Sequence, residues 1–168
     1  NPLVTVLMPV YNGERYLNSA IDSILNQTYN NLEFLIINDG STDRSVEIIN
    51  EYKDSRIRYI KNETNINLAK SLNKGVKLSN AKFIARMDCD DISHPDRLKK
   101  QVGYMLKHPD TALLGSGFTK INKHGRKLYR IEMPFISLVI RWKMLFFNCF
   151  AHPTIMLNKD KLIQHKLN

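Results

Sequence analysis

Three carboxylates occur within four positions, at Asp88, Asp90 and Asp91, and they directly follow the apolar run 81–87, which predicts a buried strand. Like charges this close raise one another's pKa unless a cation neutralises them. Carboxylate oxygens are hard ligands that suit Mg²⁺ or Mn²⁺. Because alternate residues of an extended segment point the same way, we expect Asp88 and Asp90 to face one metal site across Cys89. The alternative is a solvated acidic turn that caps the following helix.

Strand-like and helix-like segments alternate along the chain, and this order predicts the framework that positions the acids. The continuous apolar run 34–37 suits a strand that is covered on both faces of a parallel sheet. We therefore predict an α/β fold, a three-layer α/β/α sandwich around a mostly parallel sheet. The expected strands are 3–8, 32–38, 57–61, 83–87 and 112–116. The first expected helix follows a cap at Asn12 and ends near residue 26, the second follows the turn 40–43, and the third spans 68–77. The fourth is capped by Ser93 and ends near His108.

Two later segments depart from this alternation. Residues 118–134 are basic and contain a glycine and a proline, which predicts a hairpin or a loop excursion. Residues 135–150 are strongly apolar but hold Arg141 and Lys143. This second segment fits an interfacial membrane helix, a core helix or one half of an acceptor groove.

The net charge of +9 lies in the second half of the chain. Residues 1–81 hold nine Lys and Arg against nine Asp and Glu, whereas residues 82–168 hold sixteen against seven. A basic half favours nucleic acid, anionic lipid or an anionic small substrate, and an ordinary solvated surface fits equally well. No run of 18 uncharged apolar residues occurs in the sequence, so we expect no membrane-spanning helix.

The two cysteines, Cys89 and Cys149, lack metal-ligand spacing and indicate a reducing compartment. The sequence starts directly with a strand pattern rather than with a signal peptide. We therefore expect a cytoplasmic protein, either free or peripheral on the inner face of the membrane.

Ligands of open α/β sheets bind outside the carboxyl ends of the strands, and here those ends carry polar segments. Only Gly13 follows the first expected strand, which argues against an NAD site. No Gly-Lys-Ser/Thr occurs, so the phosphate loop of nucleotide hydrolases is absent. Binding of a diphosphate would therefore depend on a metal and on cationic side chains.

Five short blocks, taken together and in this order, resemble the family 2 glycosyltransferases. They cover nearly the whole chain, and the resemblance implies an inverting enzyme with the GT-A fold. The blocks are Pro9-Val10-Tyr11-Asn12, residues 38–43, residues 65–75, residues 85–91 and His152-Pro153-Thr154.

The resemblance also implies roles for individual residues. Tyr11 resembles the aromatic residue that lies against the nucleotide base, and Asp39 resembles the acid that hydrogen-bonds the base edge, usually uracil. Asp88 resembles the acid that faces the ribose, Asp90 the metal ligand that bridges to the diphosphate, and Asp91 a neighbour that shapes the donor-sugar site. The expected donor-binding set also includes Pro9, Asn12, Asn65, Lys70 and Arg86, and the implied metal, held by Asp90 and Asp88, is Mn²⁺ or Mg²⁺.

Each role has a structural alternative. Tyr11 fits plain packing at a strand end, Asp39 fits a turn residue, and Arg86 fits pairing with the acids rather than with phosphate. The sequence also departs from the family pattern at Asn67, where a glycine is common, and at Cys89, where Ala or Ser is usual. Asn tolerates a left-handed backbone, so we expect the turn at Asn67 to survive.

Inverting transfer needs a carboxylate that takes the proton of the acceptor hydroxyl. The resemblance places this base after the His-Pro-Thr block, often in a Glu-Asp pair, whereas only Asp160 follows here. We therefore expect an N-terminal portion of a longer enzyme, with the base beyond Asn168. Residues 1–117 would be its nucleotide-sugar-binding part, and residues 118–168 would begin the acceptor-binding part of the same domain.

The resulting hypothesis is a metal-dependent inverting glycosyltransferase of cell-surface polysaccharide synthesis. It would use a UDP-sugar and a glycan or lipid-linked acceptor, with contact to an anionic membrane and without a nucleic-acid partner. A non-catalytic sugar-nucleotide-binding module and a nucleotidyltransferase are the alternatives.

Overall fold

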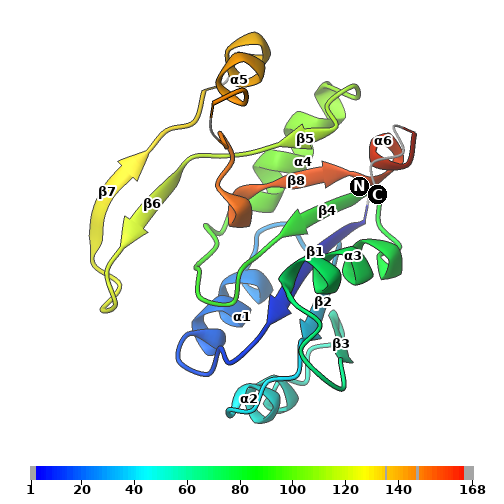
Figure 1. Cartoon of the computed structure of the whole chain (residues 1–168), viewed down its shortest axis with the longest axis vertical. Helices are drawn as coiled ribbons and strands as arrows, with labels where there is room; N and C mark the ends of the chain where they lie inside the picture. Colours follow the sequence, from blue (N-terminus) through cyan, green and yellow to red (C-terminus); the bar gives the residue numbers. More distant parts are fainter. Residues whose placement is uncertain (1–2, 135, 147, 165–168) are drawn as a thin grey trace.

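A six-stranded sheet crosses the middle of the computed structural model, which describes residues 3–134, 136–146 and 148–164 (Figure 1). Its strand order is β3-β2-β1-β4-β8-β5. All pairings are parallel except those of β8, which runs antiparallel to both β4 and β5. The strands are β1 (Val4–Val10), β2 (Leu32–Asn38), β3 (Ile57–Lys61), β4 (Phe83–Arg86), β5 (Leu113–Leu114) and β8 (Met156–Asn158).

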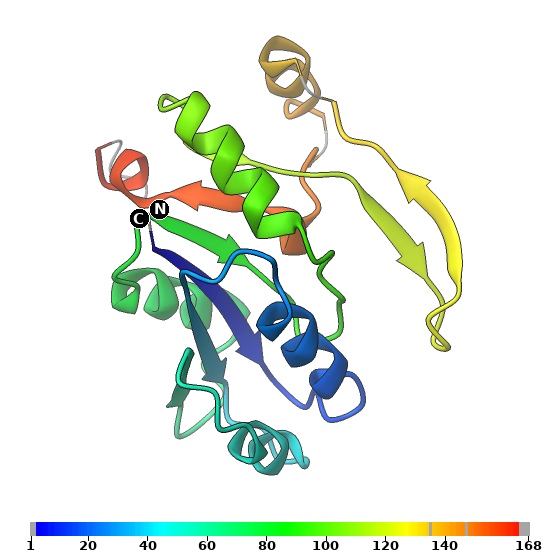
Figure 2. The ribbon, with the colours of Figure 1, turned by 180° about the vertical axis from the view of Figure 1, so that it is seen from behind.

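Helices cover both faces of this sheet, which confirms the predicted mostly parallel α/β sandwich. One core cluster joins alternate residues of β1 with α1, α2 and α4, and Figure 2 shows α1 and α4 on that face. The other cluster joins the intervening residues, such as Leu7 and Leu35, with the apolar side of α3. Burial on both faces explains the continuous apolar run 34–37. The helices are α1 (Leu17–Leu25), α2 (Ser45–Glu51), α3 (Leu68–Leu78), α4 (Arg97–Lys107) and α6 (Lys159–Gln164).

Two predicted helix starts are wrong. Helix α1 begins at Leu17, because Asn12 takes a left-handed φ of 51° and its side chain accepts a hydrogen bond from the Thr42 N–H rather than capping a helix. Helix α4 begins at Arg97, because the segment before it packs across the end of α1, where the Ser93 N–H donates to Ser23 Oγ. In both cases a tertiary hydrogen bond replaces the local cap.

The basic stretch forms the expected hairpin, in which β6 (Phe118–Ile121) and β7 (Lys127–Ile131) pair as a separate two-stranded sheet. The hairpin projects away from the central sheet and leads to helix α5 (Ser137–Lys143) (Figures 1 and 2). The chain then passes through the 3₁₀ turn η1 (His152–Thr154) into β8. Phe135, the first residue of the expected apolar segment, lies outside the described residues. Within the described ranges, no helix is long and apolar enough to cross a membrane.

Candidate functional site

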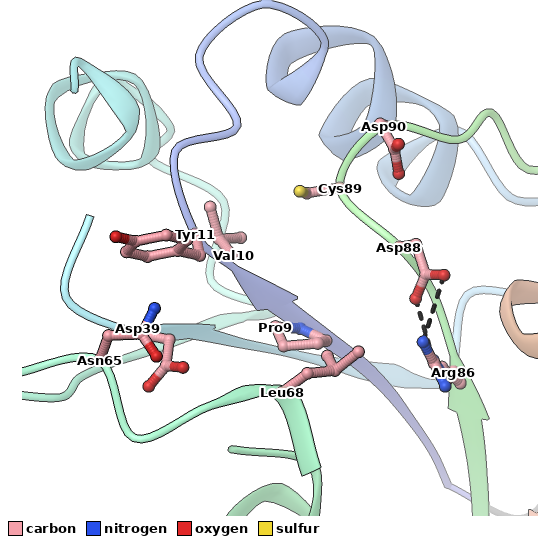
Figure 3. Close-up of a pocket in the computed structure, with 10 residues that line it drawn as sticks. All are labelled: Pro9, Val10, Tyr11, Asp39, Asn65, Leu68, Arg86, Asp88, Cys89 and Asp90. Atoms are coloured by element: carbon pink, nitrogen blue, oxygen red, sulfur yellow. Dashed lines mark hydrogen bonds and ion pairs between the residues drawn. The ribbon is translucent and has the colours of Figure 1, made fainter. Parts of the chain in front are cut away.

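A cavity of about 320 Å³ lies at the carboxyl ends of β1, β2 and β4 (Figure 3). Its volume falls in the range of small-molecule sites. The parallel register of the three strands brings their ends to the same edge of the sheet, so segments far apart in the sequence meet there. The lining residues are Pro9, Val10, Tyr11, Asp39, Asn65, Leu68, Arg86, Asp88, Cys89 and Asp90.

Seven of the ten predicted site residues line this cavity: Pro9, Tyr11, Asp39, Asn65, Arg86, Asp88 and Asp90. Three others do not. Asn12 locks the loop before α1 to Thr42, and the backbone N–H of Lys70 donates to the Asn67 cap of α3. Asp91 is half-buried and, unlike Asp88 and Asp90, does not line the cavity.

One side of the cavity is formed by Tyr11, Asp39 and Asn65 (Figure 3). Tyr11 is 51% exposed, which is unlike a residue used for packing at a strand end, and its ring fits a surface on which a flat base can stack. Asp39 is buried, and its Oδ1 accepts hydrogen bonds from Asn62 Nδ2 at 2.8 Å and from the Ile66 N–H at 3.0 Å. Asp39 therefore holds the loop that carries Asn65.

The pKa of Asp39 is below its usual value. Burial works in the opposite direction and raises it, but hydrogen bonds from the Ile66 N–H, Asn62 and Ser71 together outweigh the burial. The carboxylate is thus ionised at neutral pH and lies at the edge of the cavity as a hydrogen-bond acceptor.

Two left-handed residues shape the loop on this side. Asn67 has a φ of 76° and its side chain accepts the Lys70 N–H, so asparagine does sustain the turn where the family often has glycine. Gly40, with a φ of 76°, lies directly against the Thr64–Asn65 backbone. Glycine is required at position 40 for both its conformation and its missing side chain.

We expect Gly40→Ala to distort the Tyr11 side of the cavity. A Cβ at position 40 would lie 2.7 Å from the Asn65 nitrogen, and a left-handed alanine costs about 1–2 kcal/mol before that clash is counted. Gly103→Ala is the control, because a Cβ built at this position of α4 would meet no side chain and no other part of the described fold within 4 Å. Thermal unfolding should show a large loss for Gly40→Ala and none for Gly103→Ala, and equal melting temperatures would contradict the expectation.

The opposite side of the cavity carries the acids. Asp88 Oδ1 accepts a hydrogen bond from Arg86 Nε at 2.9 Å, and Asp88 Oδ2 accepts one from Arg86 Nη2 at 3.3 Å (Figure 3). The two side chains are largely buried, so this ion pair is better shielded from solvent than a surface pair. The alternative in which Arg86 pairs with the acidic cluster is therefore the arrangement observed.

The acids do not lie on an extended segment, and that part of the prediction is wrong. The chain turns after β4, with the Asp91 N–H donating to the Asp88 carbonyl oxygen at 3.3 Å. The turn still leaves Asp88, Cys89 and Asp90 along one wall of the cavity. Within the described residues, the Asp90 carboxylate has no hydrogen bond or ion pair.

The crowded acids help to raise the pKa of Asp91 and of the Cys89 thiol. Burial, together with the charges of Asp90 and Asp88, raises the pKa of Asp91 to about 6, against the opposing effect of Arg97 and Arg86. Burial, together with the charge of Asp90, raises the pKa of the Cys89 thiol to about 11, so Cys89 is a neutral thiol at the cavity wall. The cluster therefore carries more negative charge than its protein partners offset, and such an environment favours a cation.

The acids fit a metal that substrate helps to hold. No three His, Cys, Asp or Glu side chains in the described part of the chain are close enough to hold a metal by themselves. Mg²⁺ is commonly held by one or two carboxylates together with substrate phosphates rather than by a protein cage. Asp90, with Asp88 beside it, has the chemistry that such a site needs.

Sequence reasoning missed several residues of this region. Leu68 lines the cavity from the first turn of α3, although nothing but its place at a helix start marked it. On α4, the Arg97 side chain donates to the Arg86 carbonyl oxygen next to the acids, and the Gln101 side chain donates to the Thr154 carbonyl oxygen. Asp160 lies at the opposite edge of the sheet, because β8 is antiparallel to β4 and Asn158 pairs with Phe83. Asp160 is therefore not a base for this cavity.

The Glycosyl transferase family 2 model matches residues 5–165, and the chain belongs to this family. It is 41% identical over 161 residues to the putative glycosyltransferase EpsE of Bacillus subtilis, covering 93% of this chain and 56% of EpsE. It is 36% identical over 169 residues to the O-antigen biosynthesis glycosyltransferase WbnJ of Escherichia coli, covering 98% of this chain and 65% of WbnJ. The chain thus spans about half to two thirds of the length of these relatives.

Solved structures of the GT-A type share the fold. TarS 1–349 of S. aureus in complex with UDP-GlcNAc matches with a TM-score of 0.77 and 22% identity, over 97% of this chain and 47% of TarS. The mannosyltransferase PcManGT of Pyrobaculum calidifontis in complex with GDP-Man and Mn²⁺ matches with a TM-score of 0.74 and 16% identity, over 98% of this chain and 47% of PcManGT. These likenesses confirm the predicted GT-A fold.

Proposed function

We propose that this chain is the donor-binding part of a metal-dependent inverting glycosyltransferase. The enzyme would transfer a sugar from a UDP-sugar to a glycan or lipid-linked acceptor in cell-surface polysaccharide synthesis. The observation that carries the proposal is the cavity itself, which has an exposed aromatic ring and a buried acid on one side and a carboxylate cluster on the other. A nucleoside diphosphate fits this arrangement, because its flat base would stack at the aromatic end of the cavity and its diphosphate would share a metal ion with the carboxylates at the other end.

In the proposed complex, the base lies against Tyr11 and its edge donates to Asp39. Asp88, oriented by Arg86, faces the ribose, and Asp90 lies toward the diphosphate. A Mn²⁺ or Mg²⁺ ion held by Asp90 and Asp88 would offset the negative charge that grows on the departing diphosphate. The cleaved bond joins the sugar to oxygen, so the transition state is oxocarbenium-like by analogy with glycoside hydrolysis.

Binding measurements can identify the nucleotide of the sugar donor. The related folds include one solved with UDP-GlcNAc and one solved with GDP-Man and Mn²⁺, so the fold alone leaves the base open. A thermal-shift panel of UDP-, GDP- and dTDP-sugars, each with Mn²⁺ and with EDTA, tests the proposal. Ligand at 100 times its dissociation constant should add about 2.7 kcal/mol of stability. A shift with UDP-sugars and Mn²⁺ is expected, and no shift with any nucleotide would overturn the proposal.

Two parts of the domain would bind the donor and the acceptor. Residues 1–117 contain every residue that lines the cavity, and we assign them to donor binding. Residues 118–168, of which 118–134, 136–146 and 148–164 are described, would begin the acceptor side. The general base remains unassigned, because Asp160 is at the wrong edge of the sheet. Transfer of sugar from UDP-GlcNAc or UDP-glucose by the intact protein, with release of UDP, would distinguish an enzyme from a non-catalytic binding module. Release of inorganic diphosphate from UTP and a sugar 1-phosphate would instead indicate a nucleotidyltransferase.

We also propose that the acceptor side contacts an anionic membrane. Exposed apolar side chains with spacing i, i+1, i+4, i+7 and i+8 form one face of α5 and the turn after it. Residues 118–146 hold seven Lys and Arg against one Glu, which complements anionic headgroups. The apolar face consists of Leu138, Val139, Trp142, Leu145 and Phe146.

Vesicle sedimentation tests this contact. We expect binding to phosphatidylcholine vesicles that contain phosphatidylserine, weaker binding without it, and loss of binding in Leu138→Glu, because a charge would enter the apolar face. Leu106→Glu is the matched control, since Leu106 is an exposed leucine of α4. Binding that is absent, or that does not depend on phosphatidylserine or on Leu138, would contradict the proposal.

A further inference from the structure

Arg97 joins three parts of the chain that meet behind the acids. Its Nη2 donates to the carbonyl oxygens of Arg86 at 2.8 Å and of Ile155 at 3.1 Å. Its Nε donates to Gln101 Oε1 at 3.1 Å, one helical turn along α4, and its Nη1 lies 3.9 Å from Met87 Sδ. A planar fork with several fixed donors can make these contacts together, whereas a lysine cannot.

Gln101 extends the same network to the root of the hairpin and α5. Its Nε2 donates to the Thr154 carbonyl oxygen at 2.7 Å, and both residues are buried. The Thr154 hydroxyl donates to the Ala151 carbonyl oxygen and accepts the Ser116 N–H. Thr154 thus connects the two ends of the segment 117–151, the excursion that contains the hairpin and α5.

The network also continues into the acid turn. The Arg86 N–H donates to the Ile155 carbonyl oxygen, so the end of β4 is held by its backbone on one side and by Arg97 on the other. The Arg86 side chain then holds both oxygens of Asp88. The positive charge of Arg97 also interacts with the charges of Asp88 and Asp91.

We propose that Arg97 and Gln101 are positioning residues that keep the acid turn 88–91 in its metal-binding geometry and fix it to the root of the excursion 117–151. Neither residue lines the cavity, so their effect on the donor passes through Arg86 and the turn. The inference rests on the proposed donor site. The network of Arg97 and Gln101 would hold the donor acids in a fixed position relative to the proposed acceptor side.

The test compares Arg97→Lys with Arg56→Lys. The first variant keeps the charge that faces Asp88 and Asp91 but loses the fork. The second is a matched control, because Arg56 likewise donates to a backbone carbonyl, that of Leu25 at 3.0 Å, and its charge lies next to a carboxylate, Asp54 at 2.7 Å, before the amino end of β3. Both should lower the melting temperature. The discriminating readout is the gain in UDP affinity, by calorimetry, when EDTA is replaced by Mn²⁺.

Arg97→Lys is expected to reduce this Mn²⁺-dependent gain by about 10- to 100-fold, as loss of a residue that orients metal ligands does, while Arg56→Lys keeps the wild-type gain. Gln101→Met loses the bonds to Thr154 and Arg97 but keeps the side-chain length, and it should also reduce the Mn²⁺-dependent gain. This second variant tests the inference if Arg97→Lys does not fold. A folded variant of either position with the wild-type gain would overturn the inference alone. A wild-type chain that gains nothing from Mn²⁺ would overturn the proposed donor site and the inference together.

Discussion

Asp90→Asn is expected to remove most of the Mn²⁺-dependent affinity for UDP. The Asp90 carboxylate borders the cavity and forms no ion pair with the residues that the structure describes, so it is the acid best placed to serve as a metal ligand. A neutral amide is a weaker ligand for a hard cation and removes one of the two charges that would hold it. Because changes outside the ligand shell already cost about 10- to 100-fold in metal affinity, loss of the ligand should cost at least that much.

The measurement is UDP binding by calorimetry in Mn²⁺ and in EDTA. Affinity in EDTA should hardly change, since the base and ribose contacts proposed for Tyr11, Asp39 and Asp88 would remain. Asp110→Asn is the control, because this exposed acid pairs with Lys161 away from the cavity. Equal UDP affinity of the wild-type chain in Mn²⁺ and in EDTA would refute metal-coupled donor binding altogether.

Asp39→Ala is expected to lower both the stability of the chain and its affinity for UDP. Asp39 Oδ1 accepts hydrogen bonds from Asn62 and from the Ile66 N–H in a buried setting. Each buried donor left without an acceptor costs about 1–3 kcal/mol. Urea unfolding should therefore show a clear loss of unfolding free energy, and the loop that carries Asn65 should lose its placement at the cavity.

Asp39→Asn separates base recognition from this structural effect. An asparagine can retain a carbonyl oxygen toward Asn62 and Ile66, so stability should remain close to that of the wild-type chain. Toward the base it replaces an acceptor with a donor, and N3 of uracil is a donor whereas N3 of cytosine is an acceptor. The ratio of UDP to CDP affinity should fall toward unity or reverse. If Asp39→Asn keeps the wild-type preference for UDP, Asp39 serves only the turn.

Local sequence patterns were sufficient to predict most of the framework. The apolar run 34–37 and the alternation of strands and helices predicted a mostly parallel sheet covered on both faces, because burial and periodicity are local properties of the chain. The rule that ligands bind at the carboxyl ends of parallel strands then brought Tyr11, Asp39 and Asp88 to one site. The structure places all three around one cavity.

Long-range contacts decided what the patterns could not. Strand β8 comes from the segment after the excursion and inserts antiparallel between β4 and β5, which moves Asp160 to the far edge of the sheet. The acid turn, the Arg86–Asp88 pair and the late start of α4 likewise depend on partners that lie nearby in space. Residue types and their order along the chain therefore determined the class of site and its acids. Tertiary hydrogen bonds decided which acid lines the cavity, which acid is held by an arginine, and how Arg97 links the end of β4 to Ile155. No local pattern specifies the partners of these bonds.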